Sequence, residues 1–208
     1  MVLRRLLQGR YEEACRESNS TEGQKKAKYF DQLFSGYTGS VSDADMGSIA
    51  WGIDNRAWSL SVEQADGVTS TWGAMANCCS FVQHYDHRGT KMLLCGDMEK
   101  DGMSLLLNTF AEFRSAVLGV NILLAPHHGH TSGFSTELMN AIGKPDIVIA
   151  SIMSGDEHVD NRYSDAQWVK GITWPDGSVS RLLTTRSYGA ITVASQGNGS
   201  FQVTTNQR

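Results

Sequence analysis

The chain has 208 residues, of which 40% are hydrophobic and 19% charged, with 21 glycines, 3 prolines and a net charge of −4. This length and composition are typical of a globular α/β domain with a sizeable core, and they exclude a long disordered linker. The negative net charge gives no strong electrostatic signal for a nucleic-acid partner. The sequence has no run as apolar and long as a membrane span and shows no signal peptide, so we expect a cytoplasmic protein.

The four cysteines show neither C-x-x-C spacing nor the pattern of a secreted, disulfide-linked protein. We interpret them as reduced, small apolar residues of the core. Cys78 and Cys79 are adjacent and would point to opposite faces of a strand, so we expect one of the two to be buried.

We expect one domain over residues 1–208, with a helical and irregular part over 1–76 and the remainder over 77–208. Amphipathic spacing predicts helices at 2–16 and 25–34. Asp43 and Asp45 form a D-x-D pair between glycine- and serine-rich turns, a setting more typical of an exposed loop than of a cation site.

Strand-like alternation begins after this region. The segment Ala57–Val62 alternates apolar and polar residues, and Asp66-Gly67 is a hairpin-turn signal. Ser80–Tyr85 and Thr90–Cys95 flank a polar, glycine-containing turn, and together they predict a β-hairpin.

The centre of the chain predicts a strand–helix–strand unit. Its strands are the apolar runs Lys91–Cys95 and Val120–Ala125. The helix between them has an apolar stripe with helical spacing, formed by Leu106, Phe110, Phe113 and Val117. Such a unit places two neighbouring parallel strands in a covered sheet. Asp97 and the pair His127-His128 follow these strands and should meet at the sheet edge where ligands bind in open α/β sheets.

Shorter elements complete the chain. We expect a helix over Ser135–Ile142, a buried strand over Ile147–Ile152, and another short helix beginning within 165–169. Glycine turns separate the closing strands, which are predicted at Leu182–Thr185, Ala190–Ala194 and Phe201–Thr204.

Three segments resemble the metallo-β-lactamase domain of the ComEC-like competence family of bacteria. They are NCCSFVQHYDHRGTKMLLCGDMEKDG, VNILLAPHHGHTSGFS and RLLTTRSYGAITV, which together cover roughly residue 77 to the C-terminus. The resemblance consists of an N-x-x-S strand, a G-D strand end, a P-H-H-G turn and a closing hairpin, in that order. It implies a partial αββα sandwich, with a mixed sheet and flanking helices. It also implies a hydrolase in which bound zinc or manganese activates a water molecule.

The resemblance also implies site residues. Asp97 corresponds to the metal-binding Asp of the G-D strand end, and His127 or His128 corresponds to the His of the P-H-H-G turn. Asp97 and His128 would be the catalytic pair. His130 stands where the family has Ser, and His158 lies near the position of a late family His that this chain lacks; both are further candidate ligands, although a surface loop also accounts for His158.

The family's upstream H-x-H-x-D-H motif is missing. The first 76 residues contain no histidine. The stretch Val82–Gly89 mimics the motif, with Val82 in place of its first His, but it runs directly into the next strand, whereas the motif should open a helix. We interpret it as the hairpin, with His84 and His87 as surface or turn residues.

Two functions remain open. The first is a metal-dependent hydrolase of phosphodiesters or other esters, incomplete or inactive as this chain alone. The second is a non-catalytic remnant of such a domain that acts as a binding or assembly module. In either case an uncovered sheet edge would favour a homo-oligomer.

Overall fold

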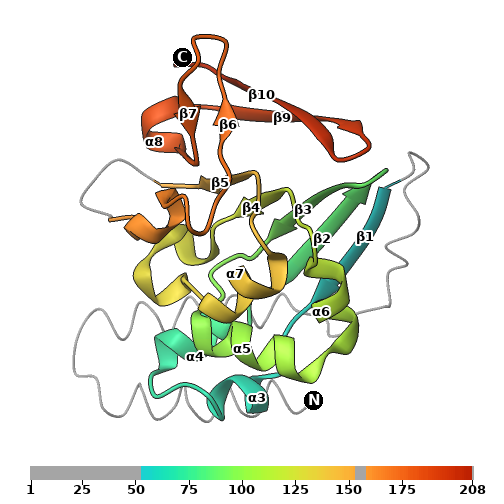
Figure 1. Cartoon of the computed structure of the whole chain (residues 1–208). Coiled ribbons are helices and arrows are strands. Elements are labelled where there is room, and N and C mark those ends of the chain that lie inside the picture. Colours follow the sequence, from blue (N-terminus) through green and yellow to red (C-terminus); the bar gives the residue numbers. More distant parts are fainter. Residues whose placement is uncertain (1–52, 153–157, 208) are drawn as a thin grey trace, which may run out of the picture. The chain divides into compact units, whose positions relative to one another are not determined.

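A computed structural model describes residues 53–152 and 158–207 (Figure 1). All of them belong to the second of two units into which the chain divides, Ser48–Arg208. The helices expected at 2–16 and 25–34, and the pair Asp43 and Asp45, lie outside the described residues. None of the helices in the described part of the chain is long and apolar enough to cross a membrane.

A six-stranded mixed sheet organises the described residues, and its strand order is β1-β2-β3-β4-β5-β8. The first three strands pair antiparallel and the last three continue from β3 in parallel. The strands are β1 (Ile53–Trp58), β2 (Val82–His87), β3 (Thr90–Leu94), β4 (Ile122–Leu124), β5 (Ile147–Ala150) and β8 (Leu182–Thr184). The expected fold class, a mixed sheet with flanking helices, is confirmed.

The connections between strands are mainly helical. The α-helices are α3 (Val62–Asp66), α4 (Trp72–Cys78), α5 (Lys100–Thr109), α6 (Ala111–Val117), α7 (Thr136–Ile142) and α8 (Thr185–Tyr188). The 3₁₀ turns are η1 (Pro126–Gly129), η2 (Thr131–Gly133) and η3 (Asn161–Ser164). Two small antiparallel pairs stand apart from the main sheet, β6 (Ile172–Thr173) with β7 (Val179–Ser180) and β9 (Ile191–Gly197) with β10 (Ser200–Thr205).

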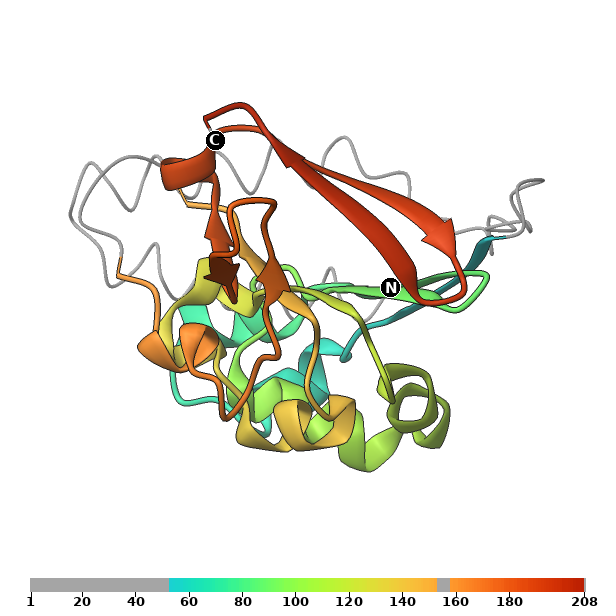
Figure 2. The same cartoon turned by 45° about the horizontal axis from the view of Figure 1, so that its top comes forward.

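Each face of the main sheet has its own core. On the helical face, Leu93 and its register neighbour Leu123 are fully buried, and the ring of Phe113 on α6 lies 5.1 Å from that of Trp58 on β1. On the other face, side chains of the β9–β10 hairpin cover a cluster in the parallel strands, formed by Ile122, Ile147, Ile149 and Leu183. Figure 2 shows the hairpin on the side of the sheet away from α5–α7. Burial on both faces explains why the parallel strands are almost continuously apolar.

The predicted hairpin at β2 and β3 is confirmed. Its strands pair as far as His87 and Thr90, so the connection has only two residues. Arg88 and Gly89 have φ values of 53° and 88°, as a two-residue turn between twisted strands requires. The Asp86 carboxylate accepts a hydrogen bond from the Gly89 N–H at 2.7 Å.

One prediction for this hairpin is wrong. His84 is only 3% exposed, on the helical face of the sheet, so it is not a surface residue. Neither of its ring nitrogens has a hydrogen-bond partner. Burial lowers the pKa of His84, because the charged imidazolium is the form that desolvation penalises most. His87, whose Nδ1 lies 2.8 Å from the hydroxyl oxygen of Ser195, is half-buried.

The predicted central helix is broken into α5 and α6 at Phe110. Phe110 has φ −110° and ψ 102°, outside the helical region, although Leu106 and Phe113 on its two sides are buried as expected. The guanidinium of Arg114 donates hydrogen bonds to the carbonyl of Leu107 across the break. This bond replaces a helical partner that the kink removes, and apolar spacing alone carries no sign of it.

Segments 57–78 differ from their prediction in element type. The first strand ends at Trp58, and a helix follows because Ser61 and Gln64 form a reciprocal capping box at its N-terminus. Asp66-Gly67 therefore ends α3 and is no hairpin turn. Cys78 is buried and Cys79 half-buried, but Cys78 lies on α4, so the strand argument for the pair is wrong.

Two further expectations differ from the structure. Asn77 lies on α4 and Ser80 in the loop after it, so the N-x-x-S stretch is not itself a strand. The short helix expected within 165–169 is absent, and the 3₁₀ turn η3 stands immediately before it. By contrast α7, which Ser135 caps through its hydroxyl, and the fully buried β5 confirm their predictions.

Candidate metal-binding site

The loops that follow β3 and β4 meet at one edge of the sheet. The backbone N–H of His127 donates to the carbonyl of Gly96 at 2.9 Å, which ties the loops together. Asp97 is held at its own N–H by the hydroxyl of Ser80, at 3.1 Å. As a result Oδ1 of Asp97 lies 3.3 Å from Nε2 of His128. The structure thus brings together the two residues expected to form the catalytic pair.

The backbone of His127 and His128 is strained, and it sets the direction of their side chains. His127 and His128 have φ values of 49° and 56°, in the left-handed region that residues other than glycine rarely adopt. Gly129 follows at φ 85°, and a Cβ added there would lie 2.8 Å from Cγ1 of Val159. Such strain persists only where the surrounding structure enforces it, and it concentrates at functional sites.

The hydrogen bond of His128 fixes its tautomer. Its Nδ1 lies 2.7 Å from the backbone carbonyl oxygen of Ser151. Because a carbonyl only accepts, Nδ1 must carry a proton and donate it. In the neutral imidazole Nε2 then carries a lone pair, and this lone pair faces the Asp97 carboxylate. Two acceptors at 3.3 Å repel each other unless a proton or a cation lies between them.

His127 and His130 share a single hydroxyl. Nδ1 of His127 lies 2.9 Å, and Nδ1 of His130 lies 3.0 Å, from Oγ of Ser132. Glu99 approaches the same Nδ1 of His127 at 3.8 Å, and Asn77 donates to the Glu99 carboxylate at 2.8 Å. These contacts hold both rings on the η1–η2 turn.

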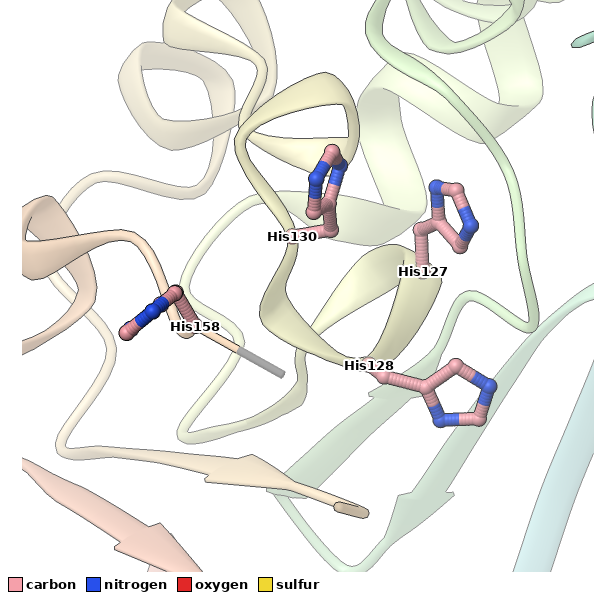
Figure 3. Close-up of a pocket in the computed structure, with 4 residues that line it drawn as sticks. All are labelled: His127, His128, His130 and His158. Atoms are coloured by element: carbon pink, nitrogen blue, oxygen red, sulfur yellow. The ribbon is translucent and has the colours of Figure 1, made fainter. Parts of the chain in front are cut away.

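Four histidines line one pocket of about 170 Å³, namely His127, His128, His130 and His158 (Figure 3). His158 is exposed and comes from the loop that precedes η3. A backbone bond of 2.9 Å from Asp160 to the Gly129 carbonyl attaches this loop to the histidine turn. In Figure 3 the rings of His128 and His158 project in opposite directions, so the four residues share a pocket without converging on one point.

A salt bridge anchors the loop that carries His158. The guanidinium of Arg162 contacts Asp160 at 2.6 Å and lies 3.9 Å above the ring centre of Phe134. Hydrogen bonds from Arg162 lower the pKa of Asp160. The carboxylate is therefore ionised at neutral pH and paired with Arg162.

Two donors fit one metal ion. At tetrahedral zinc, ligand bonds of roughly 2.0–2.2 Å place neighbouring donor atoms about 3.4 Å apart. The 3.3 Å separation of His128 Nε2 from Asp97 Oδ1 matches this spacing. Their side chains are 51% and 49% exposed, so an ion in solution can reach them. In residues 53–152 and 158–207, no group of three or more His, Cys, Asp or Glu is arranged to hold a metal.

The nearby cysteines are poorly suited as thiolate ligands. Burial raises the pKa of Cys95, which lies two residues before Asp97. Burial likewise raises the pKa of Cys78, whose sulfur packs near α5. Both thiols are therefore protonated at neutral pH, which agrees with their interpretation as reduced core residues.

Sequence reasoning missed several residues that support the site. Ser132, Ser151 and Glu99 contact its histidines directly. Of these, Glu99 could have been suspected from the sequence, because it lies two residues after Asp97 at the start of a helix. The contact of the Ser151 carbonyl could not have been suspected, because backbone atoms carry no residue-specific pattern. Ser80 and Asn77 were singled out through the N-x-x-S stretch, but their contacts with the Asp97 segment could not be foreseen.

No protein-family model matches the chain, and no curated protein matches it.

Proposed function

We propose that this chain carries a metal site of the metallo-β-lactamase type, derived from a hydrolase of phosphodiesters or related esters. One observation carries the proposal: Nε2 of His128, whose Nδ1 is taken up by the Ser151 carbonyl, faces the Asp97 carboxylate at 3.3 Å, at the ends of two neighbouring parallel strands. The Ser151 carbonyl accepts the Nδ1–H of His128 and so orients the imidazole, as carbonyl groups commonly do for metal-binding histidines.

Asp97 and His128 would hold the ion, and His127 is the candidate third ligand. The ring centres of His127 and His128 are 6.4 Å apart on the same turn. A zinc or manganese ion bound there would act as a Lewis acid and activate water for attack on an ester. The residues themselves supply position and charge: the strained turn orients the imidazoles, and the carboxylate offsets the charge of the cation.

The resemblance to the ComEC-like family supports the hydrolytic chemistry. It also accounts for the weakness of the site, since the ligands of the H-x-H-x-D-H motif have no counterpart in this chain. Ligands from another polypeptide would complete the site, and we propose that the chain alone is inactive or only weakly active.

The alternative is a non-catalytic remnant that serves as a binding or assembly module. It is favoured by the lack of a preformed three-ligand group among the described residues. The two proposals differ in metal content, because a remnant needs no ion.

The deciding experiment measures metal per chain by elemental analysis, on protein purified without chelator. The variants are wild type, Asp97→Ala and, as a matched control, Asp101→Ala, which removes an exposed carboxylate in the first turn of α5. We expect about one zinc or manganese ion per chain in wild type and Asp101→Ala, and none in Asp97→Ala. Wild type without metal, but folded, would reject the hydrolase and leave the assembly module.

A further inference from the structure

The β9–β10 hairpin has an edge that no other strand of the described residues pairs with. Strands β9 and β10 form a two-stranded sheet in the order β10-β9, and the main sheet contributes no strand to it. The pairing register is Phe201 with Ser195, Val203 with Val193 and Thr205 with Ile191. Among residues 53–152 and 158–207, one edge of β10 therefore has no neighbouring strand (Figure 2).

The direction of each backbone group along β10 follows from one bond. The N–H of Asn206 donates to the carbonyl of Ala190 at 3.2 Å, so this pair is hydrogen-bonded. Hydrogen-bonded and non-hydrogen-bonded pairs alternate along an antiparallel ladder. Residues 202 and 204 are therefore bonded to β9, whereas Phe201, Val203 and Thr205 direct their N–H and C=O groups to the open edge. Within the described residues these six groups have no backbone partner outside the hairpin.

The open edge lacks the features that prevent strands from pairing. The segment Phe201–Thr205 has no charged residue, no proline and no glycine, and its register is regular. By contrast the edge strand β1 carries the exposed ion pair Asp54–Arg56. Charges on an edge strand disfavour strand addition, and their lack permits it.

A hollow adjoins part of β10. A hollow of about 520 Å³ lies between residues 202–205 of β10 and the turn Trp174–Asp176. Four consecutive residues of the strand line it, so it runs along the backbone and is not confined to one face.

We propose that two copies of this chain pair through β10, antiparallel and centred on Val203. In this register Val203 faces Val203 of the second copy, and Phe201 faces Thr205 of the second copy. Phe201, Val203 and Thr205, whose N–H and C=O groups point to the open edge, each lie opposite one of these residues in the second copy. The pairing therefore gives six backbone hydrogen bonds. The product is a four-stranded sheet, β9-β10-β10-β9, about a two-fold axis. The same patch serves both partners, as in isologous dimers.

The side chains on the solvent-exposed face of β10 also match between the two copies. Gln202 and Thr204 are exposed, and each lies opposite the other residue of the second copy. Both side chains are neutral and hydrogen-bonding. The self-complementary register and the uncharged edge favour a second copy over a foreign extended peptide, and the inference is independent of the metal site.

The test is the concentration dependence of mass in sedimentation equilibrium, with the full chain. Wild type is expected to show a reversible monomer–dimer equilibrium. Val203→Pro removes an N–H that points away from β9, so it retains the hydrogen bonds between β9 and β10 and should weaken dimerisation about tenfold or more. A wild type that remains a monomer at high concentration would overturn the proposal.

A charge variant guards against misfolding of the proline variant. Gln202→Lys with Thr204→Lys places like charges opposite each other across the axis and should also abolish the dimer. The matched control is Thr192→Lys with Ala194→Lys, which adds the same charge at exposed positions of β9 directly paired with 204 and 202. Equal loss of dimer in both double variants would contradict pairing through β10.

Cross-linking fixes the register. Gln202→Cys combined with Thr204→Cys puts cysteines in closely spaced pairs of the proposed ladder, so oxidation should give a disulfide between residues 202 and 204 of the two copies, identified by mass spectrometry. The single variant Gln202→Cys should give no 202–202 disulfide. A dominant 202–202 link, or no intermolecular link at these positions, would reject the register.

Discussion

The backbone N–H of His127 donates to the carbonyl oxygen of Gly96 at 2.9 Å, between the loops that leave two neighbouring parallel strands. This bond connects the segment that carries Asp97 to the turn that carries His128. The relative position of the two proposed ligands is therefore set by main chain, and side-chain replacements at the site should leave it intact. Site variants can accordingly test metal binding without a large change in fold.

Zinc is expected to stabilise the protein. At a free concentration 100-fold above its Kd, an ion that binds only the folded state raises the unfolding free energy by about 2.7 kcal/mol. Asp97→Ala and His128→Ala should abolish this increase. His158→Ala should retain most of it, because that ring points away from His128. Urea unfolding with and without zinc measures the effect, and full stabilisation of Asp97→Ala would place the ion elsewhere.

Gly129→Ala should be more destabilising than another substitution at positive φ. Gly119 has φ 71°, and a Cβ added there would meet no atom within 4 Å, so Gly119→Ala should cost about 1–2 kcal/mol of unfolding free energy through strain alone. At Gly129 the new methyl group also meets Val159 at 2.8 Å, which should add about 1 kcal/mol or more. Equal losses in chemical denaturation would show that the turn is not tightly packed.

His84 should make the protein less stable in acid. Its pKa is lowered in the folded state by burial, first, and then by Lys91, so the unfolded chain binds the proton more readily. The charges that act on it lie on three strands: Asp54 and Arg56 on β1, Asp86 on β2 and Lys91 on β3. The stabilisation is complete above the unfolded pKa of about 6.5 and is lost as the pH falls towards the lower folded value.

The variant His84→Leu isolates this contribution. It should flatten the decrease of unfolding free energy below about pH 6.5. At pH 7 it should be neutral or stabilising by about 1 kcal/mol, because two buried nitrogens without partners are removed. Urea midpoints between pH 5 and 8 provide the measurement, and an unchanged pH slope would contradict the assignment.

Arg114 should stabilise the junction between α5 and α6. Arg114→Ala removes the donors to the Leu107 carbonyl and is expected to cost about 1–2 kcal/mol of unfolding free energy. The control Glu112→Ala changes an exposed residue of the same short helix. Similar unfolding free energies for the two variants would show that the bond does not contribute.

Much of the sheet could be predicted because its strands carry strong local signals. The apolar runs of β3, β4 and β5, and the glycine turn between β2 and β3, give strand type and pairing directly. The meeting of Asp97 with His128 followed from one rule, that consecutive parallel strands end at the same edge.

The remainder depends on contacts that no short pattern contains. Alternation at Ala57–Val62 favoured a strand, but the capping box of Ser61 and Gln64 begins a helix within it. The break at Phe110 comes without the proline or glycine that usually signals the end of a helix. The burial of His84 could not be read from the sequence, because a polar residue in a hairpin strand normally faces water.

The strand order of the main sheet follows the order of synthesis: β1, β2, β3, β4, β5 and then β8. Each new strand finds its partner already made, so the sheet can grow from one side while the chain is still emerging from the ribosome. Its second apolar face is different, because β9 and β10, which cover Ile122, Ile149 and Leu183, come last. That face keeps only part of its cover, from Ile172, Trp174 and Tyr188, until translation of the hairpin ends. A ribosome stalled between β8 and β9 would thus expose a nascent chain that is prone to aggregation. Chaperones that recognise apolar surface should bind it.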